Sequence, residues 1–213
     1  LAAEPQSVEW KPLFRDSLRF LTIENGFRYA TEAATRSPGL PFFRGYADAV
    51  TNLHGWDDGN PLLDNYIGHP MQGAVSGYIW ARHDLRYRHV EFGRDPDYWK
   101  SRLRAGAFMW AYSEQLEIGP FSEASIGNIQ AKPPEQGFVD HVITPALGLV
   151  WLIGEDAIDR YLIRRLEQRT QSRPWRAILR GTLNPTRSFA NVIGGRYPWA
   201  RPTDEYNLYR LGP

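Results

Sequence analysis

Small, aromatic and ionisable residues recur at three- and four-residue spacings along three stretches of the chain, which is the spacing of one helix face. The rows are His69-Gly73-Gly77-Trp80-Asp84, Gly106-Trp110-Glu114 and Asp140-Thr144-Gly148-Trp151-Glu155-Asp159. Glycines in such rows let helix backbones approach closely, so we expect the acids and histidines of these rows to face neighbouring helices. The pattern predicts a packed helical domain with a polar cluster inside it.

Turn and capping residues divide the rest of the chain into further helices. Asp95-Pro96-Asp97 is typical of a helix start, because Asp caps the first turn and Pro fits the first helical position. Helices are predicted to begin at Lys11 and end before Pro38, and to cover 42–53, 65–86, 95–117, 138–171, 173–182 and 184–193, with one turn at 123–129. No stretch alternates with a period of two for long, so no strand is predicted.

The predicted fold is therefore all-α, with residues 1–213 forming one domain. We expect an irregular bundle of about five to seven helices, with extended arms at residues 1–10 and 197–213. Residues 160–169 are rich in charge, so this part of the longest helix is expected to leave the core.

Composition removes several classes of function. The chain has 25 basic and 24 acidic residues, and this balance gives no basic face for nucleic acid. It has no Cys, which excludes disulfides, thiolate nucleophiles, Cys-ligated zinc and iron–sulfur clusters.

Aromatic residues make up 14% of the chain and include eight Trp, a residue type that collects at membrane interfaces. The longest uncharged runs, 65–81 and 141–154, are shorter than the ~20 residues of a spanning helix. No spanning segment is predicted, and whether the apolar residues 142–153 enter lipid stays open. The chain starts Leu1-Ala2-Ala3 without Met, as a processed terminus would, so we expect a bacterial cell-envelope location, periplasmic or membrane-associated.

Five ionisable residues of the helical rows, together with His141 next to Asp140, are candidates for a catalytic site: His69, Glu114, Asp140, His141, Glu155 and Asp159. Three of them, His69, Glu114 and Glu155, are also candidate ligands of a divalent metal, since bundles build metal sites from inward Glu and His. The alternative, favoured by the many Arg residues, is a structural network of ion pairs. His54, His83 and His89 are expected in a turn or on the surface, without a role.

The chain lacks the motifs of several well-defined sites. There is no Glu-x-x-His or His-Glu-x-x-His, which argues against a di-iron centre or a zincin. There is also no Gly-x-Ser-x-Gly elbow, phosphate-binding loop or dinucleotide fingerprint. No cofactor is therefore expected, with a divalent metal left open as the alternative.

Short motifs spread over residues 64–190 resemble those of an uncharacterised bacterial domain-of-unknown-function family. They are Asn65-Tyr66-x-x-His69-Pro70-x-x-Gly73, Trp110-x-x-x-Glu114-x-x-Glu117, Ser125-Ile126-x-Asn128, Thr144-x-x-x-Gly148, Gly154-Glu155 and Asn184-Pro185. The resemblance implies an exported envelope protein with short, semi-apolar helices, and it implies no activity. Asn128 stands where the family is expected to have Asp, which weakens any catalytic use of that position.

These observations favour a non-enzymatic envelope protein that serves as a membrane-associated accessory or scaffolding subunit. Its expected partner is a membrane surface or a membrane protein complex. The first alternative is a hydrolase or lipid-modifying enzyme that uses His69 with Glu114 and Glu155, with or without a metal. The second alternative is a lipid or small-molecule binder that uses the glycine-lined seam as a groove.

Overall fold

The fold is taken from a computed structural model, which describes residues 7–36, 41–127, 131, 136–170 and 172–201. Over these ranges the chain is helical, and the β pairing consists of one isolated bridge between Val8 and Asp84. The all-α irregular bundle is thus confirmed. Asn128 and most of both predicted arms lie outside the described residues.

Some helices follow one another almost directly, whereas longer connections at 52–63 and 84–95 separate others. The first half of the chain contains α1 (Trp10–Thr31), α2 (Ala33–Arg36), α3 (Phe42–Thr51), the π-helix η1 (Asp64–Gly68) and α4 (His69–His83). The second half contains α5 (Pro96–Ile118), α6 (Glu123–Ile126), α7 (Val139–Ile158), the π-helix η3 (Asp159–Ile163), α8 (Arg164–Glu167), α9 (Arg173–Leu183) and α10 (Pro185–Ile193). As predicted, Asp95 caps α5 by accepting from the backbone N–H of Asp97 at 2.8 Å.

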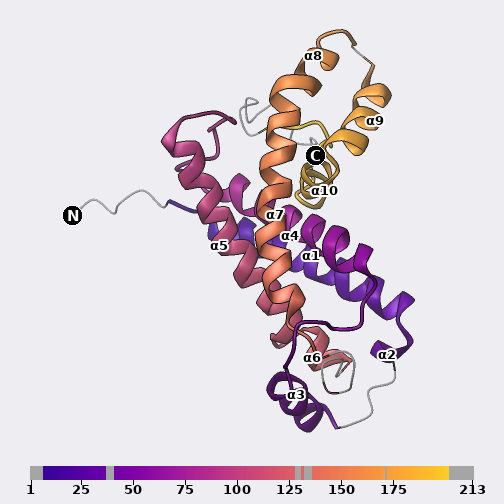
Figure 1. The fold of residues 1–213 in the computed structure, drawn as a ribbon. Coiled ribbons are helices and arrows are strands. Elements are labelled where there is room, and N and C mark those ends of the chain that lie inside the picture. The colour runs from indigo at the N-terminus through magenta and orange to yellow at the C-terminus, as the bar shows by residue number, and fades with distance from the viewer. Residues whose placement is uncertain (1–6, 37–40, 128–130, 132–135, 171, 202–213) are drawn as a thin grey trace, which may run out of the picture.

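Helices α4, α5 and α7 form the centre of the molecule and make the most extensive contacts with one another. Each contributes a fully buried side chain to the core, namely Ile79, Met109 and Leu152. Helix α7 runs lengthwise along the molecule with α5 beside it, α3 and α6 gather at one end, and α8 and α9 lie at the other (Figure 1). Helices α1 and α10 pack against α4.

The glycine rows bring α4 and α7 into backbone contact. A Cβ on Gly73 would overlap the carbonyl oxygen of Thr144, and a Cβ on Gly148 would lie 3.1 Å from the Cα of Gly73. A Cβ on Gly77 would overlap the side chain of Met109. The glycines therefore allow the close approach of helix backbones that the sequence predicts, because any larger side chain at these positions would push the helices apart.

Helix α7 has two chemically different faces. Its inner face buries Asp140, Thr144, Glu155 and Asp156, and Asp159 at the start of η3 is buried as well. Its outer face carries apolar residues at every fourth position, a row that we call the α7 outer row: Val142, Ala146, Val150, Gly154 and Ile158. The charge of α7 is thus turned inward.

By length and composition, the continuous helix Val139–Glu167 is the one described helix that could cross a membrane. Its most apolar stretch has a mean hydropathy of 1.3, and 28% of that stretch is buried. The uncharged run 141–154 alone predicts no such segment, whereas the helix continues through the acidic residues that follow it. A core helix of the same composition would have the same properties.

The structure corrects two expectations about burial. Residues 160–169 do not leave the core entirely, because Ile163 is fully buried and Glu167 is 9% exposed. His83, expected on the surface, is 4% exposed, and its Nε2 lies 3.0 Å from Asp16 Oδ2. In both places the partner comes from a distant helix, which local spacing does not reveal.

The glycine contact yields a matched pair of stability predictions. Gly73→Ala is expected to destabilise the protein by about 1–3 kcal/mol, because the new methyl group overlaps the α7 backbone. Gly154→Ala has no atom within 4 Å of the new methyl and should be neutral or stabilising by about 0.5–1 kcal/mol through helix propensity. Thermal unfolding followed by circular dichroism measures both. Equal melting temperatures for the two variants would contradict the close approach of α4 and α7.

Candidate functional site

Three side chains from three helices meet at the end of the molecule where α7 begins. His69 is the first residue of α4, Glu117 lies in the last turn of α5 and Asp140 lies in the first turn of α7. Their nearest ligand atoms all lie within 4.8 Å of one another, the one such group of three found among the described residues. His69 Nε2 is 3.5 Å from Asp140 Oδ2. We call these three residues the His69 cluster.

A loop between α3 and η1 covers this cluster. The backbone N–H of Phe138 donates to Gly55 O at 3.2 Å, and that of Val139 donates to Trp56 O at 3.1 Å, so the loop lies against the start of α7. Asp58 of the same loop contacts Asp140 and accepts from Asn65 Nδ2 at 2.7 Å.

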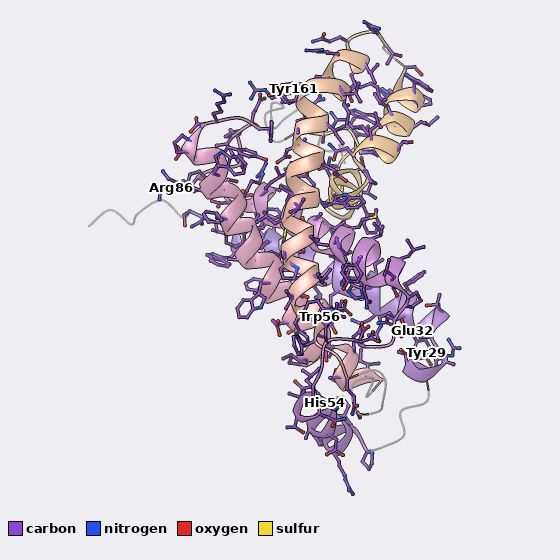
Figure 2. All side chains as sticks on the ribbon, viewed as in Figure 1. Tyr29, Glu32, His54, Trp56, Arg86 and Tyr161 are labelled. Atoms are coloured by element: carbon purple, nitrogen blue, oxygen red, sulfur yellow. The ribbon has the colours of Figure 1, made fainter. Side chains whose placement is uncertain are left out.

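Figure 2 places Trp56 and Glu32 at the end where α7 begins and Tyr161 at the opposite end. Trp56 packs edge-on against Phe138 with ring centroids 5.6 Å apart. The loop and the start of α7 therefore shield one side of the His69 cluster from water.

His69 lines a partly open cavity of about 730 Å³ between α1, α4 and α10. The cavity has an apolar lining from Phe20, Phe27, Val75, Leu116 and Phe189, and a polar lining that includes Glu24, Arg28, Glu32, Glu123 and Gln72. A cavity of this size, with apolar walls and a few convergent polar groups, fits a small amphipathic molecule.

Burial dominates the electrostatics of this end of the molecule. It raises the pKa of Glu24 to about 8 and that of Glu123 to about 7. Burial and a hydrogen bond with Asp58 raise the pKa of Asp140 to about 9. Burial also raises the pKa of Glu117 well above its usual range. The site thus gathers several buried acids with raised pKa values, an arrangement that is enriched at functional sites.

Two cationic or potentially cationic groups accompany these acids. Arg28 Nε is 3.0 Å from Glu123 Oε1, and Arg28 Nη2 is 3.1 Å from Glu32 Oε2. Burial lowers the pKa of His69, which favours the neutral imidazole. A neutral imidazole offers a nitrogen lone pair to a proton or a metal.

The structure separates the remaining sequence candidates from His69. Glu114 and His141 form a pair of their own, with Glu114 Oε2 3.0 Å from His141 Nδ1. Glu114 precedes Glu117 by three residues on α5, His141 directly follows Asp140 on α7, and both are partly buried. Glu114 is therefore not a member of the three-residue group that contains His69.

Glu155 caps the start of α10 and does not lie beside the other candidate metal ligand His69. Its Oε1 accepts from the backbone N–H of Thr186 at 3.0 Å, and its Oε2 accepts from that of Arg187 at 3.1 Å. Its Oε1 also accepts from Trp151 Nε1 at 2.9 Å. Glu155 thus supplies the partners that the first amides of a helix lack, and it is not in the group with His69.

Asp159 belongs to a network of ion pairs between η3, α8 and the C-terminal segments. Arg180 Nη1 is 2.6 Å from Asp159 Oδ1, and Arg180 Nε is 2.8 Å from Glu167 Oε1. Arg187 and Arg201 also pair with Asp159. Burial opposes ionisation, yet these guanidinium groups hold the pKa of Asp159 far below its usual range. Asp159 therefore fits the predicted structural network.

The sequence analysis did not select Glu117, Asp58, Glu24 or Glu123 for the site. Glu117 comes three residues after Glu114, so both lie on roughly the same side of α5. Spacing alone therefore does not show which of the two contacts His69. Glu24 sits between the buried residues Leu21 and Arg28 at helical spacing, a signal that would have placed it on the inner face of α1.

Comparison of the chain with protein-family models, with curated proteins and with solved structures found no match. The resemblance to an envelope family of unknown function therefore stays a prediction, and the functional argument depends on the geometry alone.

The raised pKa of Glu24 predicts how stability depends on pH. Its folded pKa of about 8 exceeds that of an exposed Glu. The free energy of unfolding therefore falls as pH rises from the pKa of an exposed Glu to about 8. Glu24→Gln should keep the hydrogen bond from Tyr112, which donates to Glu24 Oε2 at 2.5 Å, and should remove the ionisation. We expect this variant to gain melting temperature over the parent protein at pH 8.5 and much less at pH 5.5.

The exposed carboxylate Asp48 provides the control, because Asp48→Asn should give the same small shift at both pH values. Thermal melts of the three proteins at the two pH values make the measurement. An advantage for Glu24→Gln that is larger at pH 5.5 than at pH 8.5 would contradict the raised pKa.

Proposed function

We propose that this protein associates with a lipid membrane through the outer faces of α7 and α5 and serves there as an accessory subunit. The observation that carries the proposal is an apolar surface that faces outward. It comprises the α7 outer row together with Trp99, Leu103, Ala107 and Trp110 on α5, and we call it the apolar face.

The side chains of the apolar face are strongly exposed. Val150 is 63% exposed, Leu103 is 67% exposed and Trp110 is 57% exposed. Helices α5 and α7 pack directly against each other, with Gly106 against Leu149, so the two rows lie on adjoining helices. Extended apolar surface of this kind marks sites of protein or membrane contact.

The composition of the face favours lipid as its partner. Neither row contains a charged residue, and α7 buries its acids on the opposite face. Trp99 and Trp110 lie at the two ends of the α5 row, and Trp is enriched where apolar chains meet headgroups. A helix that lies in the interface with its apolar face toward the acyl chains has this pattern.

Two charge-introducing variants test the proposal. Val150→Glu combined with Leu103→Glu should weaken co-sedimentation with phosphatidylcholine–phosphatidylglycerol vesicles by roughly tenfold or more, since burial of each apolar side chain contributes about 1.5 kcal/mol or more. Both positions are exposed, so circular dichroism should show an unchanged fold.

The matched control makes the same change on another surface. Phe43→Glu with Leu63→Glu replaces side chains that are 83% and 73% exposed, and it should bind vesicles as the parent does. A parent protein that remains wholly in the supernatant would sink the proposal. Equal losses of vesicle binding in both double variants would show that net charge, and not the apolar face, determines the binding.

A second candidate function, hydrolysis of an amphipathic ester, is favoured by the position of the His69 cluster beside an amphipathic cavity. Water would add across the ester bond to give an acid and an alcohol, with the neutral imidazole of His69 accepting the proton of the water. Mass spectrometry of phospholipid vesicles incubated with the protein and divalent metal ions should show a hydrolysed product. Asp140→Asn should reduce its rate at least tenfold, and a parent protein that forms no product would exclude this candidate for phospholipid esters.

A further inference from the structure

We infer that His69, Glu117 and Asp140 bind one divalent transition-metal ion at the wall of the cavity. This inference goes beyond membrane association, and it assigns a different ligand set from the one that the sequence predicts.

The distances suit a single ion. Ligand atoms about 2.1 Å from a metal lie about 3–4 Å from one another. His69 Nε2 and Asp140 Oδ2 are already 3.5 Å apart, and all three ligand atoms fall within 4.8 Å of one another. These separations are close to those that one ion held by all three side chains would require.

Buried polar atoms around the cluster lack partners that a cation would provide. No N–H group or hydroxyl of the described residues donates to Asp140 Oδ1, although Asp140 is only 5% exposed. Asn65 Oδ1, on a side chain that is 3% exposed and bonded to Asp58, likewise has no donor. Buried acceptors without donors destabilise a fold, so their gathering beside three ligand-type side chains indicates an ion-binding role.

The charge balance points the same way. Asp58, Glu117 and Asp140 gather around His69, while Arg28 of the same end of the molecule is engaged with Glu123 and Glu32. Clustered carboxylates repel one another, and a divalent cation bound among them would reverse the sign of that interaction.

The ligand types and the cavity define the kind of ion. One imidazole nitrogen with carboxylate oxygens suits Zn²⁺, Mn²⁺ or Fe²⁺ better than Ca²⁺ or Mg²⁺, which prefer all-oxygen sets. Three protein ligands leave coordination positions open, as in catalytic rather than structural sites. Because His69 also lines the cavity, an oxygen atom of a molecule in the cavity would take one of those positions.

Titration of chelator-treated protein with Zn²⁺ and with Mn²⁺ in a calorimeter tests the inference. We expect one ion per chain and a raised melting temperature on binding. Asp140→Asn and Glu117→Gln should each lower the affinity at least tenfold.

Glu114→Gln is the matched control, because it makes the same change on α5 three residues away, at a side chain that pairs with His141. It should bind the metal as the parent does. Cobalt substitution adds a readout independent of stability, since Co²⁺ absorption bands report an imidazole–carboxylate ligand set in the folded protein.

Three outcomes would overturn the site: no saturable binding by the parent, unchanged affinity in both Asp140→Asn and Glu117→Gln, or an equal loss in Glu114→Gln. Should Asp140→Asn fail to fold, Glu117→Gln and the cobalt spectrum of the parent decide the question. Failure here leaves the vesicle experiment unaffected, because the apolar face and the His69 cluster share no residue.

Discussion

The backbone contact between α4 and α7 is the constraint on which the rest of the structure depends. Gly73 meets Thr144, and Gly148 meets Gly73 and Pro70 O, so these helices pack without side chains between them. His69 precedes Gly73 by four residues, and Asp140 precedes Thr144 by four. One helical turn from the contact, the two ionisable side chains are therefore forced together. The same glycines that stabilise the core thus create its most unusual electrostatic environment.

The two ends of the molecule treat buried charge in opposite ways. At the α8–α9 end, Asp159 and Glu167 pair with Arg180, which is fully buried. At the other end, Glu117 and Asp140 gather around a histidine with a lowered pKa. The ion pairs at the first end hold helices together. The buried acids at the other end repel one another when ionised, which favours the binding of a cation.

Helical spacing predicted the fold class, most helix boundaries and a polar cluster between the helices, because all of these depend on local periodicity and on where glycines permit contact. It could not choose Glu117 over Glu114, since residues three apart both point roughly toward the same neighbour. It grouped Glu155 with Asp140 on one face, yet fifteen residues along a helix separate them by about 22 Å. Two residues on the same helix face can thus be too far apart along the helix to belong to one site. The partners of His83 are Asp16 of α1 and Glu9 just before that helix, and no local pattern contains that information.

The cap that Glu155 places on α10 has a consequence for the cavity. Pro185 and Thr186 line the cavity, and the start of a helix would ordinarily attract a phosphate or carboxylate group there. The amides of Thr186 and Arg187 already donate to Glu155, so they are not available to bind an anionic group in the cavity. An anionic headgroup entering the cavity would have to find its positive charge on the opposite wall, at Arg28 or at an ion held by His69.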